Sequence, residues 1–496
     1  MGIMAMSEKE VKIRDAKIDA FDFIDRNNKE IAKIGDAIFY FAELGMQEFR
    51  TSEYAIDAIS KAGFDVEIGI AGMPSAWIAT WGSGKPVVAV VFEGDALPNS
   101  SQVSGVPEEK PIIAGAPGHA EGHNTNVAVT LGAAVAAKTV MEKKAIPGTI
   151  KLFFSPAEEQ FISRPYMLRD GYFAGVDVFF HPHLMSDFST TYGIRQYANI
   201  AAEFIFHGRS ASSRMAPWMG RNALDAVTLM DVGWSLMRQQ LEPSQRSHRA
   251  VLAGGDQASV IPKYAKMEWG FTNQTMEQAS ETFKKAKKIA EGAAIMTGCT
   301  YEVNLLSTCW PTRANQTMAE IIQKNMEMVG MPKWSKEEET LAKTLQKKIN
   351  VPIVGLQKKI TPLREAKQRA SSNDSGCITW VMPCGFFYFP ANIPGCEFHS
   401  WPAGVSLATT IAHKAEINGA KVLAASMLDL FCEEAWLRKV KKSFKEEIGD
   451  ARYFEVMPPD QKPPVDLNRE QMEKWRPVMK KFYIKKKVHW KSALSG

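Results

Sequence analysis

Residues 118–124 read Gly-His-Ala-Glu-Gly-His-Asn and stand directly before an Ala- and Val-rich stretch that predicts a buried helix. The glycines allow sharp backbone turns, so the imidazoles and the carboxylate can converge just outside the start of that helix. Histidine nitrogens and carboxylate oxygens are typical ligands of divalent metal ions. Taken alone, the stretch fits a metal site and a polar helix-capping loop equally well.

Three apolar runs of strand length each end in a group of acidic or imidazole side chains. The runs are residues 87–92 before Glu93 and Asp95, 148–154 before Glu158 and Glu159, and 176–180 before His181 and His183. In open α/β sheets, ligands bind beyond the carboxyl ends of the strands, which is where these side chains would lie. Together with residues 118–124, they predict a metal site in an α/β domain.

The sequence changes character near residue 198, where a β-α-β-β-α-β order begins. This order predicts a small α+β sandwich with helices on one face of an antiparallel sheet. Because 496 residues exceed one ordinary core, we expect the sandwich to be inserted into a larger domain. The predicted parts are a catalytic domain from residues 1–197 and 310–440, an inserted domain from 198–309, and a basic C-terminal extension from 441–496. Residues 8–40 predict one long amphipathic helix, and residues 333–367 a peripheral helical insertion.

Composition and charge narrow the classes of function. Hydrophobic residues make up 45% and charged residues 23%, as in a globular protein, and neither a transmembrane span nor a signal peptide is recognisable. The six cysteines form no C-x-x-C pair, which indicates reduced thiols and a cytoplasmic location. The net charge of +5 is mild, and no nucleic-acid-binding module is evident. We therefore expect a small-molecule substrate, with neither nucleic acid nor a membrane as partner.

Together, these loops resemble metallopeptidase family 20, the aminoacylase/carboxypeptidase G-like amidohydrolases, and within it the p-aminobenzoyl-glutamate hydrolase and hippurate hydrolase-like branch. The matching segments are 42–48, 93–98, 118–124, 156–159, 177–182, 220–226, 373–374, 398–401 and 411–414. The resemblance implies a zinc-peptidase-like α/β catalytic domain with a mixed, largely parallel sheet, and an inserted α+β domain that serves as lid and dimerisation surface. It also implies a homodimer or higher homo-oligomer formed through that inserted domain.

The resemblance further implies roles for individual residues. Glu158 is expected to be the general base, which takes a proton from metal-bound water and returns it to the leaving nitrogen. The expected ligands of one or two divalent ions, manganese or zinc, are Glu121, His123, Glu159, His181 and His399. His183, His119 and His413 fit a ligand and a supporting role equally well.

The departures from the family pattern concern the metal and the substrate. Glu121 stands where the branch typically has cysteine, which favours manganese over zinc and weakens the expectation of two metal ions. Ser212 stands where a histidine of the small domain normally steadies the developing oxyanion. The candidates for contacting the substrate are Ser212, Arg214, Asn373 and His183. Aromatic side chains suit either a planar substrate or the core; they are Trp218, Trp401, Phe386, Phe387 and Tyr388.

Three functions fit this pattern. The first is a metal-dependent hydrolase that uses activated water to cleave the C–N bond of a small aromatic amide or N-acyl amino acid. The second is a hydrolytic deaminase of an activated aromatic amine, similar to a nitroanthranilate aminohydrolase, and the altered Glu121 and Ser212 add weight to it. The third is a non-catalytic binding protein on the same scaffold, against which Glu158 argues because a pure binder needs no general base.

Overall fold

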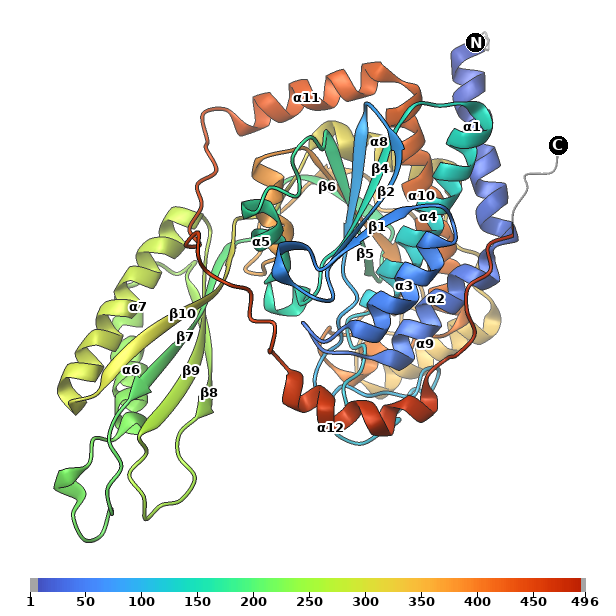
Figure 1. Cartoon of the computed structure of the whole chain (residues 1–496). Coiled ribbons are helices and arrows are strands. Elements are labelled where there is room, and N and C mark those ends of the chain that lie inside the picture. Colours follow the sequence, from blue (N-terminus) through green and yellow to red (C-terminus); the bar gives the residue numbers. More distant parts are fainter. Residues whose placement is uncertain (1–7, 492–496) are drawn as a thin grey trace.

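The computed structural model describes residues 8–491, which form a large α/β unit and a smaller one beside it (Figure 1). The large unit surrounds a nine-stranded mixed sheet with the order β1-β2-β4-β3-β5-β13-β6-β11, and β12 pairs with β6. Its strands are β1 (Asp65–Ile68), β2 (Trp77–Ser83), β3 (Val87–Phe92), β4 (Gly148–Phe154), β5 (Val178–Met185), β6 (Ser189–Ile194), β11 (Arg313–Ala314), β12 (Arg364–Glu365) and β13 (Cys384–Pro390). The central strands β4, β3, β5 and β13 are parallel, as expected of a catalytic α/β sheet.

Helices cover both faces of this sheet. The helices of the large unit, which include α9 and α12 away from the sheet, are α1 (Glu8–Arg26), α2 (Asn28–Phe41), α3 (Phe49–Ser60), α4 (His123–Lys144), α5 (Ser163–Arg169), α8 (Gln316–Val329), α9 (Lys336–Lys348), α10 (Thr410–Cys432), α11 (Glu434–Ile448) and α12 (Arg469–Met479). Strand β3 is apolar throughout because Val88 and Val90 pack into the core with α1, α2, α4 and α10, while Ala89 and Val91 face the opposite core. None of the helices in residues 8–491 is both long and apolar enough to cross a membrane.

Two expected helices differ from the structure. The single helix predicted over residues 8–40 is divided at Asn27, whose side-chain amide donates to the carbonyl of Phe23 at 2.9 Å. An asparagine that bonds its own backbone competes with helix continuation, and this competition explains the break. The insertion predicted over residues 333–367 is helical only in α9, which starts with a capping box at Ser335.

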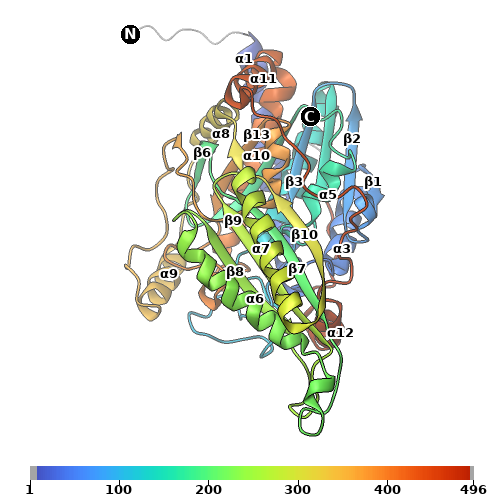
Figure 2. The ribbon, with the colours of Figure 1, turned by 90° about the vertical axis from the view of Figure 1, so that its left-hand side faces the viewer.

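The smaller unit holds a four-stranded antiparallel sheet with the order β10-β7-β9-β8. Its elements are β7 (Ala198–His207), α6 (Ala223–Met237), β8 (Arg246–Ala253), β9 (Tyr264–Asn273), α7 (Met276–Thr297) and β10 (Thr300–Cys309). Both helices lie on one face of the sheet (Figure 2), where Trp234, Trp269 and Phe271 form an aromatic core. The chain enters this unit after β6 and returns through β11, so both connections meet at one junction.

After α11, the C-terminal segment crosses the large unit, forms α12 and returns to the N-terminal helices (Figure 1). Trp490 stacks on Phe23 with ring centroids 6.3 Å apart, and the backbone N–H of Lys491 donates to the side-chain oxygen of Asn27 at 2.8 Å. Met472 of α12 is fully buried. This segment is therefore an integral layer of the fold.

Candidate metal centre

The acidic and imidazole side chains meet beyond the carboxyl ends of β3 and β4, beside His181 and His183 within β5 and at the start of α4. Gly122 has a φ of +126°, and a Cβ there would lie 2.5 Å from Leu184, so this turn before His123 requires glycine. Ala157 adopts the left-handed conformation with φ of +57° directly before Glu158 and Glu159. Such conformations are uncommon outside glycine and are concentrated at functional sites.

His123 is oriented as a ligand. Its Nδ1 lies 2.9 Å from Asp95. Its Nε2 is buried, has no hydrogen-bond partner in the described part of the chain, and lies 3.6 Å from Glu158 and 4.0 Å from Glu121. Burial alone would lower the pKa of His123, but the hydrogen bond to Asp95 and the surrounding carboxylates raise it well above its usual value. A buried imidazole nitrogen that faces carboxylates, with its other nitrogen held by an acid, is the arrangement of metal-bound histidines.

Glu121 connects two groups of side chains. One carboxylate oxygen lies 3.3 Å from Nε2 of His183, and the other lies 2.9 Å from Nε2 of His399. Glu159 lies on the second side, 3.3 Å from His399. Burial raises the pKa of Glu121, but the hydrogen bonds from His183 and His399 outweigh burial and hold that pKa well below the usual range. Glu121 is therefore a carboxylate with one oxygen on each side of the centre.

Neighbouring carboxylates raise the pKa values of both His399 and Glu159. The hydrogen bonds to Glu121 and then to Glu159 raise the pKa of His399 to about 10. Burial, and next the charge of Glu121, raise the pKa of Glu159 to about 7. Without a cation, the centre thus retains protons that a metal ion would replace.

His181, which is expected to be a metal ligand, has no free ring nitrogen among the described residues. Its Nε2 lies 3.1 Å from Glu93 and its Nδ1 lies 3.0 Å from the hydroxyl of Ser375, so both ring nitrogens are already engaged. Burial lowers the pKa of His181 to about 3, so the ring is neutral. In His183, by contrast, Nδ1 is bound to the carbonyl of Leu184 at 2.8 Å and Nε2 is left to face Glu121. The ring nitrogen that faces Glu121 thus belongs to His183, whereas both ring nitrogens of His181 have other partners.

Glu158 is buried beside these ligands. One of its oxygens accepts a hydrogen bond from the amide of Asn373 at 2.5 Å, and burial raises the pKa of Glu158 well above its usual range. The carbonyl oxygen of Asn373 accepts from Arg164 at 3.3 Å, so both ends of the Asn373 amide are in use. Asn373, which is expected to contact the substrate, holds Glu158 in this structure.

Ser212 and Arg214 are not brought to the centre. Both are exposed on the loop between β7 and α6, at the free end of the small unit (Figure 1). Trp218 lies on the same loop and is 71% exposed, and Phe387 is buried in the core on the opposite face of the sheet. Phe386 lies on the centre's side, with its ring 4.7 Å from that of His181.

Four residues for which the sequence predicted no individual role complete the centre. Arg164 is fully buried and pairs with Glu93 and, at 2.5 Å, with Asp374, while Asp95 holds His123 and the backbone N–H of Glu159. Glu93 and Asp95 follow a buried strand, the signal that placed them among the acidic side chains expected at this edge of the sheet. Arg164 and Asp374 are 210 residues apart in the chain, and no local pattern reveals their contact.

The turn that carries the two glutamates is supported by the C-terminal segment. Glu48 accepts a hydrogen bond from the backbone N–H of Ala157 at 2.7 Å. The loop around Glu48 is held in turn by Asn468, which donates to the carbonyl of Gly45 at 3.0 Å, and by Arg476, which donates to the carbonyl of Gln47 at 3.0 Å. Residues far beyond the predicted catalytic domain therefore stabilise this turn.

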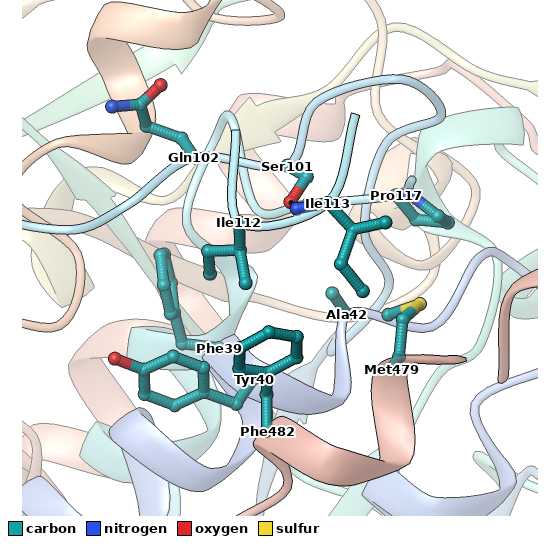
Figure 3. A pocket seen from close by; sticks show the side chains of 11 residues that line it. Phe39, Tyr40, Ala42, Ser101, Gln102, Ile112, Ile113, Pro117, Met479 and Phe482 are labelled. Atoms are coloured by element: carbon teal, nitrogen blue, oxygen red, sulfur yellow. Dashed lines mark hydrogen bonds between the residues drawn. The ribbon is translucent and has the colours of Figure 1, made fainter. Parts of the chain in front are cut away.

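A small pocket lies between α2, the loop before Gly118 and the C-terminal segment (Figure 3). Its wall includes Phe39, Ile113, Met479 and Phe482. With a volume of about 20 Å³, it has room for one water molecule and none for a substrate. The pocket is a seam between packed segments, so the metal centre is the better candidate for chemistry.

Comparisons with known proteins agree with this geometry. A model of peptidase family M20/M25/M40 matches residues 92–459. The chain is 29% identical to one of the subunits of p-aminobenzoyl-glutamate hydrolase from Escherichia coli K12, over 88% of this chain and 96% of that protein. Among solved structures, an aminobenzoyl-glutamate utilization protein from Klebsiella pneumoniae superposes with a TM-score of 0.57 at 17% identity, covering 81% of this chain and 97% of that one. The Bacillus subtilis YXEP protein, described as a dinuclear metal binding peptidase, superposes with a TM-score of 0.50 at 17% identity, covering 82% and 99%. The chain therefore belongs to peptidase family M20/M25/M40, as its loops predicted, and is a hydrolase of C–N bonds.

Proposed function

We propose that this protein is a metal-dependent amidohydrolase that cleaves the amide of a small N-acyl amino acid, of the class represented by p-aminobenzoyl-glutamate. The observation that carries the proposal is Glu121, whose two oxygens face separate histidines beside the buried Glu158. The buried and unpartnered Nε2 of His123 supports a cation here, because a buried polar atom without a partner is costly. The similarity to the Escherichia coli hydrolase supports the class of substrate.

The donor atoms would suit two ions, and Glu121 would help to hold both because its oxygens face different histidines. His123 and His183 would complete one side, and Glu159 and His399 the other. Glu93 also lies within 3.9 Å of His183, but Arg164, Asn126 and His181 already occupy its oxygens. An all-nitrogen-and-oxygen ligand set favours manganese over the softer, thiolate-preferring ions.

The chemistry divides between the ions and the protein. When bound, divalent ions of this kind lower the pKa of water and polarise a carbonyl group. Glu158 is the proton carrier, because its raised pKa brings it toward the range in which a carboxylate both accepts and donates at neutral pH. Asn373, itself held by Arg164, fixes the direction in which Glu158 points.

A second candidate is hydrolytic deamination of an activated aromatic amine. Within residues 8–491 the small unit has two histidines, and neither lies at the centre: His207 pairs with Glu302 at 3.0 Å, and His248 lies over Gly270. An amide oxyanion would thus lack an imidazole donor from the small unit of this chain, whereas an activated ring carries its developing charge on a substituent.

The test uses Glu158→Gln, with Glu268→Gln as the control at a half-buried glutamate of β9. We expect the manganese-loaded wild type and Glu268→Gln to hydrolyse p-aminobenzoyl-glutamate, and Glu158→Gln to retain metal but lose turnover by several orders of magnitude. Release of ammonia from an activated aniline without amide cleavage would establish the second candidate. Purified protein that binds no divalent ion would refute both.

We also propose that the protein is a homodimer through the small unit. Strand β8 is an unpaired edge, and apolar side chains are exposed on it and on the neighbouring α6: Val251, Leu252, Val232 and Leu236. A long apolar edge of this kind is normally covered. Sedimentation should show a dimer that Leu236→Glu converts to a monomer, and a monomeric wild type would contradict the proposal.

A further inference from the structure

Arg195 is a buried arginine at the junction between the two units. It follows β6 and precedes β7, and 7% of its surface is exposed. Its backbone is held on both sides, because its N–H donates to the carbonyl of Thr312 at 2.8 Å and its carbonyl accepts from Arg369 at 2.8 Å. The backbone is therefore fixed, and the buried side chain does not extend freely into solvent.

The guanidinium of Arg195 has no anionic partner among residues 8–491. Its carbon lies 4.4 Å from the ring centre of Phe386 and 4.9 Å from that of Tyr388, and one amino group donates to the Tyr388 hydroxyl. The other amino group, Nη1, is buried without a hydrogen-bond partner, and in residues 8–491 no carboxylate forms an ion pair with Arg195. Contacts with aromatic faces offset only part of the cost of burying a cation, so an anion is the missing partner.

The two aromatic residues connect Arg195 to the metal centre. On the parallel strands β13 and β5, Phe386 is in register with His181, and Tyr388 with His183. The Tyr388 ring lies 6.2 Å from that of His183, edge to face. Arg195 thus lies one side chain beyond the candidate ligand His183, on the same face of the sheet and toward the small unit.

The surface around this position attracts anions. Strand β12 pairs with β6 next to Arg195, and its segment, residues 358–369, carries five basic residues and one acidic residue. The basic residues are Lys358, Lys359, Arg364, Lys367 and Arg369. Exposed charges of one sign around a site raise the local concentration of oppositely charged substrate.

We propose that Arg195 and the Tyr388 hydroxyl form the binding site for a carboxylate of the substrate. This inference rests on the proposed amidohydrolase function and specifies which part of the substrate is recognised. The guanidinium offers a planar pair of donors that matches a carboxylate, and the Tyr388 hydroxyl, which accepts from Arg195, retains its own proton to donate. The expected amide therefore carries a free carboxylate beside the scissile bond.

The test measures kcat/KM for two amides in the wild type, in Arg195→Gln and in Arg195→Lys. One amide is p-aminobenzoyl-glutamate, and the other is its analogue with both carboxylates converted to carboxamides. Arg195→Gln should lower kcat/KM for the dicarboxylate about 10- to 100-fold, mainly through KM, as expected for one lost charged hydrogen bond. The diamide should change less than about threefold, and Arg195→Lys, which retains charge but not the fork, should fall between.

The matched control is Arg313→Gln. Arg313 is also buried, lies over the ring of Trp380 and pairs with β6 next to Arg195, but it has Glu447 as a partner at 3.5 Å. Its replacement should leave the ratio between the two amides unchanged. Equal losses on both amides in Arg195→Gln would overturn the inference while leaving the amidohydrolase function in place.

Binding separates this inference from the function on which it rests. The metal-loaded Glu158→Gln protein, titrated by calorimetry, should bind the dicarboxylate more tightly than the diamide, and Arg195→Gln in that background should remove the difference. If wild type cleaves neither amide, the proposed function fails and this titration still decides the carboxylate site. Equal or undetectable binding of the two compounds would overturn the carboxylate site at Arg195.

Discussion

Replacing His183 and His181 separately distinguishes a metal ligand from the residue that supports it. The two rings lie on one face of β5, but only His183 directs a free nitrogen at Glu121, while His181 is held between Glu93 and Ser375. His183→Asn removes one direct ligand of a site that has three, so we expect a loss of one metal ion per chain. His181→Asn leaves every ligand in place and removes only a neutral ring behind them.

The expected magnitudes differ enough to measure. Loss of a supporting partner typically lowers metal affinity by about 10- to 100-fold, or about 1.4–2.7 kcal/mol. His181→Asn should therefore still bind two ions per chain at saturating manganese, with weaker affinity, whereas His183→Asn should bind one at any accessible concentration. Equilibrium dialysis with elemental analysis measures both, and circular dichroism checks that each variant is folded. Two ions in His183→Asn together with one in His181→Asn would refute the assignment.

Three further predictions concern the same centre and its support. Glu121→Cys, which restores a thiolate, should shift metal preference from manganese toward zinc, seen as a reversal of the competition between the two ions; an unchanged preference would show that Glu121 does not select the metal. Met472→Ala should lower the free energy of unfolding in urea by about 2–5 kcal/mol because this side chain of α12 is fully buried, whereas the exposed Met328→Ala should change it by less than about 0.5 kcal/mol. Because hydrogen bonding to Glu121 and Glu159 raises the pKa of His399 to about 10, its charged form stabilises the metal-free fold fully below pH 6.5, and that contribution is lost as pH rises toward 10. Metal binding must displace this proton, so calorimetry at pH 8 in two buffers should detect proton release, and titrations at different pH values should show an affinity that increases with pH. An absence of proton release would contradict the ionisation of His399.

The sequence predicted the α/β sheet and the gathering of acidic and imidazole side chains at one edge of it, because both depend on local signals. Apolar runs end at Glu93 and at Glu158, and parallel strands bring their carboxyl ends to one edge. The choice between His181 and His183 is not local. The two alternate residues share a face, and the contact that engages His181 comes from Ser375, 194 residues away.

Other differences have the same origin. Asn373 is expected to contact the substrate, and in the structure its amide donates to Glu158 and accepts from Arg164. Both partners lie more than 200 residues away in the chain, with separations of 215 and 209. Arg195 carries no sequence signal as a binding residue, since its significance lies in being buried without an acid. Unsatisfied hydrogen-bonding capacity is a property of the packed molecule and cannot be read from residue types.

The path of the C-terminal segment has a consequence for how the enzyme is made. Asn468 follows its partner Gly45 by 423 residues, and Arg476 follows its partner Gln47 by 429 residues, so the ribosome adds both long after the loop that they hold. All the candidate metal ligands, including His399, therefore exist in the nascent chain before the turn that carries Glu158 is fully supported. Since synthesis proceeds at about 5–20 residues per second, the active centre is completed only seconds after its last ligand is translated.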